Sequence, residues 1–459
     1  MVSQQQLYQQ ARKARDARFD GQFFVAVKST GIFCRPICPA PSPKEENVEY
    51  FSLAPLAMQA GYRPCLRCRP DSAPGSFAWK GVDTTVERAI KLLRIHPGLK
   101  VCEICEKLGV SDRYLRALFT RKLGIAPKQF RIFEQLLFAK QLLHQSKLSV
   151  EDVAQASGFS SARRLQDNLK TGLQLTPTQI RKNAMTRSEP LIGSSAGTLH
   201  IQLSFRAPYD WQRLRGFLAM RAIAGIEEVS ETFYARHFSL DKVSGYFKAT
   251  FNQAKQCFDV QLQIAELSHI QAVVQHIRRV LDLDADPHVI HQGLLSTGLD
   301  SKALVSGLRI PGIWSTFEAG CRAILGQQIS VKAAINLVTA LAHQLGEKHQ
   351  GKLIFPTAEA VAGSDLAFLK MPSKRRDSLR AFGAYCAQHP DVSTLDDWLS
   401  IKGIGPWTVA YAKMRGQSDP DIWLDTDLVI KKQIQQNQLN PAAAQPWRSY
   451  LTFQLWSMA

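Results

Sequence analysis

The sequence predicts a multidomain protein of three units: a small α+β unit rich in cysteine, an all-α unit, and a larger unit in which an antiparallel sheet is followed by helices. Its 459 residues suffice for roughly two to four domains of ordinary size. Two polar stretches containing Pro or Gly, at 69–81 and 187–197, divide the chain. Across these breaks the pattern of apolar residues changes from irregular to a helical period and then to alternation.

The formal charge of +18 is unevenly distributed along the chain. Residues 1–190 hold 30 Lys and Arg against 16 Asp and Glu, a net charge of +14, whereas residues 191–459 carry a net charge of +4. A polyanionic partner is therefore expected first in the N-terminal part. No apolar run reaches the ~20 residues that cross a bilayer, and the start lacks the apolar segment of a signal peptide. We expect a soluble, cytoplasmic protein with no membrane partner.

Four of the nine cysteines gather in the first unit, predicted over residues 1–75. Cys34 and Cys38 are separated by three residues, and after 26 more residues Cys65 and Cys68 follow, separated by two. Four thiolates are a ligand set that tetrahedral zinc prefers. Because this unit shows little hydrophobic periodicity, a metal ion would supply stability that its small core lacks. The spacing leaves open whether the sulfurs only hold zinc or whether one also reacts.

The remaining cysteines are scattered, and an odd total is a poor match to a secreted disulfide framework. Cys102 and Cys105 have a metal-like spacing, but they lie in the helical pattern "VCEICEKLGV" with no second pair nearby. Core positions are predicted for both.

The second unit, predicted over residues 83–185, contains two stretches of the same plan about 50 residues apart. "LKVCEICEKLGVSDRYLRALFTRKLG" turns at Gly109, and "LSVEDVAQASGFSSARRLQDNLK" turns at Gly158. Ser111 and Ser149 are N-cap candidates. Each stretch predicts a helix-turn-helix unit.

The second helix of each helix-turn-helix unit, predicted over 112–122 and 161–171, carries a basic face. Such faces are usually only solvated, but two of them in a strongly basic half indicate nucleic acid. The candidate DNA-contacting residues are Arg113, Arg116, Arg163 and Arg164.

Alternating apolar residues open the third unit in "TLHIQLSF", "GYFKATF" and "CFDVQLQIA". They predict an antiparallel sheet near 198–265 within an α+β subdomain at 198–290. An all-α region follows at 291–459, with a helical stretch interrupted near Gly326.

Two glycines, Gly403 and Gly405, join the helices predicted in "TLDDWLSIKGIGPWTVAYAKMRG". A hydrophobic residue between two glycines, followed at once by a helix N-terminus, exposes backbone N–H groups to a phosphate. Carbonyls of the preceding turn could also hold a monovalent cation against it. Downstream, "DIWLDTDLVIKK" offers the carboxylates of Asp421, Asp425 and Asp427.

Residues 5–72 closely resemble the N-terminal zinc domain of the Ada family of bacterial adaptive-response proteins, through "FVAVKSTGIFCRPIC", "ENVEYF" and "AGYRPCLRCRPD". The resemblance implies repair of methyl phosphotriesters in DNA by irreversible methyl transfer to Cys34, with Cys38, Cys65 and Cys68 as the other zinc ligands. A zinc with four thiolates carries a formal charge of 2−, which methylation reduces to 1−. Repair would then also raise affinity for DNA.

Residues 83–183 resemble the AraC-type DNA-binding domain that follows the zinc domain in Ada, through the repeated endings "KLGIAPKQFR" and "GLQLTPTQIR". This resemblance implies helices in successive major grooves of an operator, transcription activation, and RNA polymerase as a partner.

Residues 199–459 resemble the helix-hairpin-helix DNA glycosylases of the 3-methyladenine DNA glycosylase II (AlkA) type, through "APYDW", "FYAR", "CRAILGQQISV", "FPT", "GIGPWTVAYAKMRG" and "PWRSYLTFQLW". Asp427 matches the family's catalytic aspartate, and Gln328 the residue wedged into the duplex. The residues that match the base pocket are Trp407, Tyr411 and Trp456. Strand-cleaving members carry a Lys where this chain has Trp407, so a monofunctional glycosylase is implied.

The combined prediction is a nucleoid-associated alkylation-response protein: a small α+β zinc domain, an all-α double helix-turn-helix domain, and a glycosylase region with an antiparallel-sheet α+β subdomain followed by helix-hairpin-helix all-α subdomains. The alternative is a transcription regulator whose third unit is a catalytically inactive, glycosylase-like DNA clamp. The Pro-Cys-His-Arg motif of the Ada methyltransferase domain does not occur in the chain, so O6-methylguanine repair is not expected.

Overall fold

The computed structural model describes most of the chain, namely residues 4–16, 19–20, 22–38, 40–65, 68, 70, 84–95, 99–146, 148–185, 198–349, 351–389 and 395–458. Of the two predicted linker stretches, 69–81 lies outside the described residues except for Pro70, and 187–197 lies outside them entirely. Among the described residues, no helix combines the length and the apolar character that crossing a bilayer requires.

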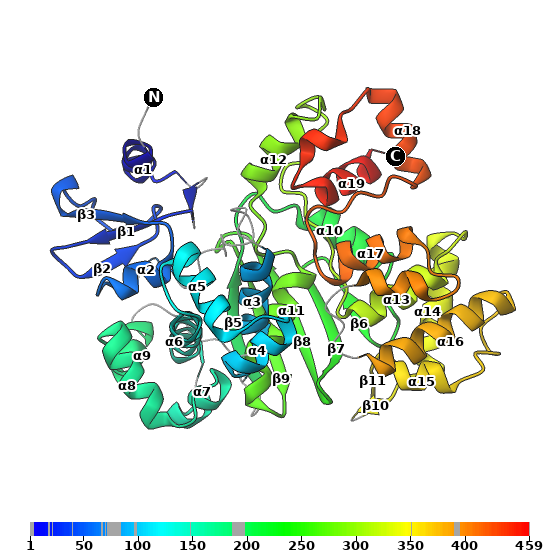
Figure 1. Ribbon diagram of the computed structural model, residues 1–459, viewed down its shortest axis with the longest axis horizontal. Helices are drawn as coiled ribbons and strands as arrows, with labels where there is room; N and C mark the ends of the chain where they lie inside the picture. Colours follow the sequence, from blue (N-terminus) through cyan, green and yellow to red (C-terminus); the bar gives the residue numbers. More distant parts are fainter. Residues whose placement is uncertain are drawn as a thin grey trace. The chain divides into compact units, whose positions relative to one another are not determined.

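Two compact units make up the structure (Figure 1). The first comprises Met1–Ser204 and Ile264–Gln275, and the second comprises Phe205–Gln263 and His276–Ala459. The cysteine-rich region and the predicted helix-turn-helix region thus belong to the first unit. Most of the predicted sheet and the hairpin region belong to the second.

The cysteine-rich region is a small four-stranded sheet with two helices, α1 (Gln4–Lys13) and α2 (Ala54–Gln59). Its strands run in the order β3 (Val48–Phe51), β1 (Phe24–Val27), β2 (Ile32–Cys34) and β4 (Arg63–Pro64), with a 3-10 turn η2 (Glu45–Asn47) before β3. Strand β1 is antiparallel to β2 and β3, whereas β2 and β4 are parallel. One of its buried clusters has only four fully buried members, Ala11, Phe23, Val25 and Val48. A region of this length buries little apolar surface, which fits the prediction that a metal ion stabilises it.

Among the residues that the structure describes, the predicted helix-turn-helix region consists of seven helices: α3 (Thr84–Ile95), α4 (Val101–Leu108), α5 (Asp112–Leu123), α6 (Pro127–Gln145), α7 (Val150–Ala156), α8 (Ala162–Leu173) and α9 (Pro177–Met185). Helices α5 and α8 agree with the predicted second helices to within two residues. The turns lie at Gly109 and Gly158, whose φ angles of 66° and 77° are left-handed and suit glycine.

Local capping explains where these helices begin. The Ser111 hydroxyl oxygen accepts a hydrogen bond from the Tyr114 N–H at 3.2 Å, and the Ser149 hydroxyl oxygen accepts one from the Asp152 N–H at 3.0 Å. Both predicted N-caps are confirmed.

The two cysteines of α4 have different environments. Cys105 is buried as predicted, but Cys102 is exposed, so its predicted core position is wrong. Helix α4 has only eight residues and buries just Ile104 and Cys105, and so narrow a buried stripe leaves Cys102 facing solvent.

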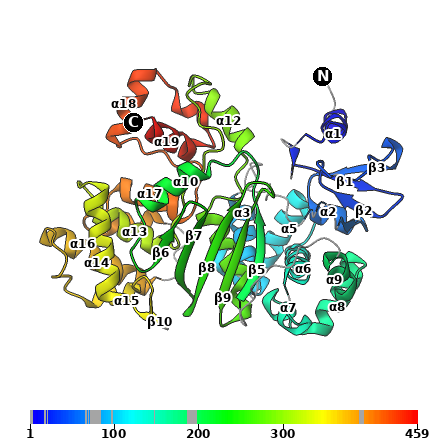
Figure 2. The ribbon, with the colours of Figure 1, turned by 180° about the vertical axis from the view of Figure 1, so that it is seen from behind.

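In the second unit, β6 (Glu227–Val229), β7 (Phe233–Leu240), β8 (Val243–Asn252) and β9 (Cys257–Ile264) are neighbours in chain order (Figure 2). The pairs β6/β7 and β7/β8 are antiparallel, and β7/β8 run in register from Phe233 opposite Thr250 to Leu240 opposite Val243. Residues Thr198–Ser204 form β5, in which buried and half-buried residues alternate. The predicted strands between 198 and 265 are confirmed.

Helix α10 (Trp211–Ala219) lies between β5 and β6 in the chain, and the elements after β9 are mostly helical: η5 (Leu267–His269), α11 (Ile270–Val280), α12 (Pro287–Leu295), α13 (Thr316–Leu325), α14 (Val331–Leu345), β10 (Lys348–His349), β11 (Lys352–Leu353), α15 (Ala358–Gly363), α16 (Ser373–Gln388), η6 (Leu395–Ser400), α17 (Pro406–Gly416), α18 (Leu428–Asn437), η7 (Pro441–Ala444) and α19 (Arg448–Ser457). The interruption predicted near Gly326 separates α13 from α14. The segment before the glycine hairpin, predicted to be helical, is the short 3-10 helix η6, a form that often serves as a connector between helices.

A buried ionic cluster joins the sheet to α13. Arg236 of β7 donates to Glu227 of β6 at 3.0 Å, and Arg322 of α13 donates to Glu227 at 2.7 Å and to Glu318 at 2.9 Å. Burial by itself raises the pKa of Glu227, but the charges of Arg322 and Arg236 lower this pKa to about 2. In its ionised form, the cluster therefore fixes the position of α13 relative to the sheet.

Candidate functional site

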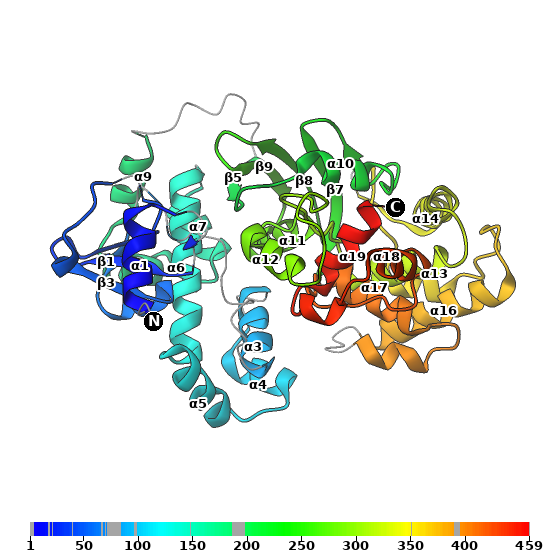
Figure 3. The same ribbon diagram turned by 90° about the horizontal axis from the view of Figure 1, so that it is seen from above.

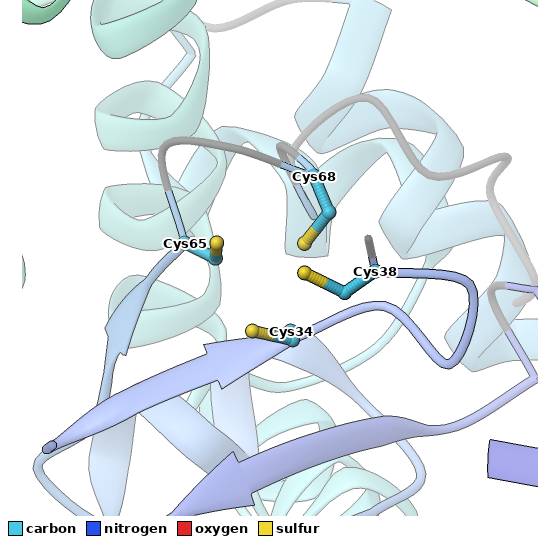
Figure 4. A group of neighbouring side chains, drawn as sticks. All are labelled: Cys34, Cys38, Cys65 and Cys68. Atoms are coloured by element: carbon cyan, nitrogen blue, oxygen red, sulfur yellow. The ribbon is translucent and has the colours of Figure 1, made fainter. Parts of the chain in front are cut away.

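The four cysteines of the first unit point toward one another (Figure 4), and their sulfur atoms all lie within 4.8 Å of one another. Cys34 ends β2 and Cys65 follows β4, so the parallel pairing of Phe33 with Pro64 brings the two distant pairs together. A tetrahedral zinc with Zn–S distances near 2.3 Å separates its sulfurs by about 3.8 Å, so this cluster fits the ion. Within the part of the chain that the structure describes, no other group of three or more His, Cys, Asp or Glu is close enough to hold a metal.

The four sulfurs are not equivalent. Cys34 and Cys38 are half-buried, whereas Cys65 and Cys68 are buried. The backbone N–H of Arg35 donates to the Cys68 sulfur at 3.3 Å, and such a bond lowers the electron density on the accepting atom. The Arg35 guanidinium also donates to the Cys68 carbonyl oxygen at 3.3 Å and to the buried Asp20 carboxylate at 2.8 Å. Arg35 therefore fixes the backbone of Cys68 and makes its sulfur less reactive.

Helices α5 and α8 expose the basic residues that the sequence predicts. Arg116 donates to Asp112 one turn earlier at 2.8 Å, so its charge is already paired on the helix surface. Arg113, Arg163 and Arg164 are exposed as well.

The hairpin before α17 requires glycine for two reasons. Gly403 has a left-handed φ of 91°, and a Cβ atom there would lie 2.0 Å from the Ser378 hydroxyl oxygen. Gly405 is the N-cap of α17, with Pro406 as the first helical residue. Among the described residues, the N–H of Gly405 has no hydrogen-bond acceptor, and it is free for a phosphate oxygen. Helix α17 lies beside α13 (Figure 3).

The three candidate carboxylates after α17 have different environments. Asp427 is the N-cap of α18, and its Oδ1 accepts hydrogen bonds from the N–H groups of Val429 at 3.0 Å and Ile430 at 3.1 Å. Its Oδ2 has no partner among the described residues. Asp421 is instead paired with Arg448 at 2.7 and 2.9 Å, and Asp425 is exposed. Asp427 therefore combines a fixed side chain with a free oxygen.

Two of the three predicted pocket aromatics stack directly. The rings of Trp407 and Tyr411 are 5.1 Å apart at 18°. The third, Trp456, has an edge contact with Phe453 at 5.1 Å, and Phe453 contacts Phe217 at 5.4 Å. Within the described residues, no ring–ring contact joins Trp456 directly to the other two.

Arg415 links the two aromatic groups. Its guanidinium lies 4.8 Å from the Phe217 ring and donates to the Tyr411 hydroxyl at 2.5 Å. Sequence reasoning missed Phe217 and Arg415, which are about 200 residues apart, because no local pattern marks a contact at that separation.

Gln328 lies on the exposed loop between α13 and α14 and has a left-handed φ of 58°. Its neighbour Ile329 is 37% exposed. A non-glycine residue in this conformation is uncommon, so the rest of the loop must hold it there.

Three family models match the chain. The metal binding domain of Ada matches residues 7–71, a helix-turn-helix domain matches residues 104–183, and the AlkA N-terminal domain matches residues 200–315. With the geometry above, these matches define a DNA-binding repair protein with a cysteine zinc centre.

Similarity to whole proteins narrows this class. The chain is 34% identical to the probable bifunctional transcriptional activator/DNA repair enzyme AlkA of Mycobacterium tuberculosis, over 97% of this chain and 95% of that protein. It is 32% identical to DNA-3-methyladenine glycosylase 2 of Escherichia coli, over 55% of this chain and 95% of that protein. It is 31% identical to the E. coli bifunctional transcriptional activator/DNA repair enzyme Ada, over 37% and 46%. The chain belongs to the family of bifunctional transcriptional activators and DNA repair enzymes that combine Ada and AlkA regions.

Proposed function

We propose that this chain excises alkylated bases such as 3-methyladenine from DNA by hydrolysis at Asp427, accepts a methyl group from DNA phosphotriesters on Cys34, and activates transcription once methylated. The observation that carries the glycosylase part is the free Oδ2 of Asp427 on a side chain fixed by two backbone N–H groups.

In the glycosylase step, an alkylated base is a cation and therefore already a good leaving group. As its bond to the sugar C1′ breaks, the sugar gains oxocarbenium character, which a nearby carboxylate stabilises. Asp427 supplies that charge, and water adds to C1′ to leave an abasic site. Electron-rich rings at Trp407 and Tyr411 hold the electron-poor base after it leaves the stack. Without a Lys at the position of Trp407, no Schiff base forms and the DNA strand stays intact.

An abasic-site assay on duplex DNA containing 3-methyladenine tests this proposal. Asp427→Asn should lower the single-turnover rate about 100- to 1,000-fold, while helix α18 stays capped because Asn is an equally good N-cap. Asp421→Asn is the matched control, and its rate should stay close to that of the wild type. Equal base release by wild type and Asp427→Asn would exclude Asp427 as the catalytic residue. Tight duplex binding without any base release by the wild type would support the inactive clamp instead.

In the methyl-acceptor step, zinc bound by the four cysteines would keep their sulfurs as thiolates at neutral pH. The Cys34 sulfur attacks the methyl carbon, the bond from that carbon to the phosphate oxygen breaks, and the phosphodiester regains its negative charge. Burial disfavours Cys65 and Cys68, and the Arg35 N–H further lowers the reactivity of Cys68. Between the half-buried Cys34 and Cys38, the resemblance to Ada favours Cys34.

Mass spectrometry of peptides after exposure to DNA carrying methyl phosphotriesters tests the acceptor. One methyl group on Cys34 is the expected result. A methyl group on Cys38, Cys65 or Cys68, or none at all, would contradict the proposal.

The regulatory part rests on the exposed arginines of α5 and α8 and on the loss of negative charge at the metal centre on methylation. We propose RNA polymerase as the protein partner and the nucleoid as the cellular location. Footprinting of promoter DNA before and after methylation is the test, with protection expected only after methylation.

We also propose domain boundaries at 1–75, 83–185, 198–290 and 291–459.

Carbonyl oxygens of the hairpin are further proposed to hold a monovalent cation. The hairpin turn is closed by the N–H of Ile404, which donates to the Ile401 carbonyl at 3.0 Å. Carbonyl oxygens have a second lone pair for a cation.

A further inference from the structure

Gln327, next to the candidate wedge residue, reaches across to the glycine hairpin. Its side-chain Nε2 donates to the Gly403 carbonyl oxygen at 3.3 Å and to the Thr408 hydroxyl oxygen at 3.3 Å. Both N–H bonds of the amide are thereby used, one on the hairpin and one on α17. The loop of residues 326–330, here called the wedge loop, is thus tied to the phosphate-binding element although about 75 residues of chain separate them.

The wedge loop needs such an anchor because its tip is strained. Gln328 has a left-handed φ of 58°, a backbone conformation that is strained for a non-glycine residue. At its two ends the loop is held by neighbouring helices: the Gly326 N–H donates to the Arg322 carbonyl at 3.0 Å, and the Ser330 hydroxyl oxygen accepts from the Ala333 N–H at 3.3 Å. Between these ends, the Gln327 amide is the side chain that reaches another element.

We infer that Gln327 is a positioning residue: it sets the wedge loop on the hairpin, so that Gln328 enters the duplex at a fixed place relative to the phosphate held near Gly403 and Gly405. The inference rests on the proposed glycosylase function and on two expectations from the sequence: that Gln328 enters the duplex and that the hairpin N–H groups bind a DNA phosphate. In this role Gln327 acts through the wedge loop and the hairpin, and not directly on the base. When the hairpin binds the DNA backbone, Gln327 holds the wedge loop where Gln328 can flip the base.

This role predicts a specific pattern of loss. The hairpin N–H groups are unaffected when Gln327 changes, so binding to undamaged duplex should persist. Flipping should weaken, because the loop no longer approaches the duplex in one orientation. Loss of two ordinary hydrogen bonds predicts a decrease of about tenfold.

The test compares Gln327→Met, which keeps the length of the side chain but donates no hydrogen bond, with Gln436→Met on the exposed part of α18 as a control. Both are made in the full chain carrying Asp427→Asn, and flipping is followed by the fluorescence of 2-aminopurine beside the lesion. Gln327→Met should reduce the flipped fraction about tenfold and change the affinity for undamaged duplex by less than about twofold. Gln436→Met should change neither quantity.

A lesion that is already unstacked gives the decisive comparison. In the chain with Asp427 intact, Gln327→Met should excise a base paired in duplex DNA about tenfold more slowly, but should match the wild type on the same base placed opposite a gap. An equal loss on both substrates, or an equal loss of duplex affinity, would overturn the inference in favour of a general structural role. Because flipping is followed in the Asp427→Asn background, absence of base release by the wild type would reject the proposed function, while the effect of Gln327→Met on the flipped fraction could still be measured.

Thr408→Val supplies a second, milder variant, since it removes one of the two acceptors and keeps the shape of a buried side chain. Its effect on flipping should be smaller than that of Gln327→Met and should vanish when combined with it. Additive effects of the two substitutions would contradict the inferred link.

Discussion

The cysteine centre and the Asp427 site differ in what holds the atoms that we propose react. Cys34 is placed by strand pairing in a small region, one of whose clusters buries only four residues fully, and it needs the other three cysteines and a metal to form a site at all. Asp427 caps a helix in a unit with a large core, and neither a metal nor a ligand is needed to fix it. In the first region fold and chemistry are therefore inseparable, whereas in the second the chemistry can be removed without disturbing the fold.

The two sites also share a feature. In each, a neighbouring group of the same chemical kind accepts a hydrogen bond from an arginine: the Cys68 sulfur from the backbone N–H of Arg35, and the Asp421 carboxylate from the side chain of Arg448. Position in the sequence does not distinguish the group that we propose reacts from its neighbours. The hydrogen-bond partners of those neighbours make the distinction.

Removal of zinc should have the largest effect, because structural zinc sites contribute about 10–16 kcal/mol to folding. Cys65→Ser should release the metal and make the region of residues 1–75 sensitive to protease, while base release stays within about twofold of the wild type. Zinc content, limited proteolysis and the abasic-site assay measure these three outcomes. Cys102→Ser, at an exposed cysteine, is the control. Loss of base release in Cys65→Ser would show that the two regions depend on each other.

Glu227→Gln should test whether the second unit relies on its buried ionic cluster as the first relies on its metal. Removing one partner of a buried ion pair costs about 3–5 kcal/mol, so the midpoint of thermal unfolding should fall at neutral pH. The pKa of Glu227 is lowered to about 2, so its stabilisation is present above the ordinary pKa of about 4.3 and is lost as the pH falls toward 2.

The difference in stability between wild type and Glu227→Gln should therefore shrink between pH 5 and pH 2, with Glu228→Gln, at an exposed residue of β6, as the control. A difference that does not depend on pH would mean that packing, and not charge, makes the cluster stabilising.

Trp407→Ala should weaken base capture without disturbing the fold. Stacking on an aromatic ring contributes about 1–3 kcal/mol per base, so the single-turnover rate at low DNA concentration should fall roughly tenfold. Trp407→Phe keeps a ring against Tyr411 and should recover most of the rate. If Trp407→Phe is as slow as Trp407→Ala, the indole acts by something other than stacking.

The smallest expected effect distinguishes the two helix-turn-helix units. Arg164→Gln should weaken operator binding about equally at all sequences and lower the salt slope by about 1 if Arg164 contacts a phosphate. Arg116→Gln should have a smaller effect, because Arg116 already has Asp112 as a partner in the free protein. Fluorescence anisotropy across a salt series measures both, and a larger effect for Arg116 would indicate that it reads a base.

Much of this fold could be predicted from the sequence, because the deciding interactions are local. The caps at Ser111 and Ser149 and the left-handed turns at Gly109 and Gly158 involve partners within a few residues. The spacing of the four cysteines likewise indicates a zinc site, because the two members of each pair are only four or three positions apart in the sequence. Local interactions of this kind can be recognised from a short run of consecutive residues.

The tertiary structure decided what depends on residues far apart in the chain. Shielding of Cys68 by Arg35 needs the pairing of β2 with β4, and the grouping of Tyr411 with Phe217 needs α17 and α10 in contact through Arg415. The bond from Gln327 to Gly403 needs α13 and α17 side by side. The sequence indicates which residues have the chemistry to react. Contacts with residues distant in the chain determine which oxygen or sulfur atom remains available for the reaction.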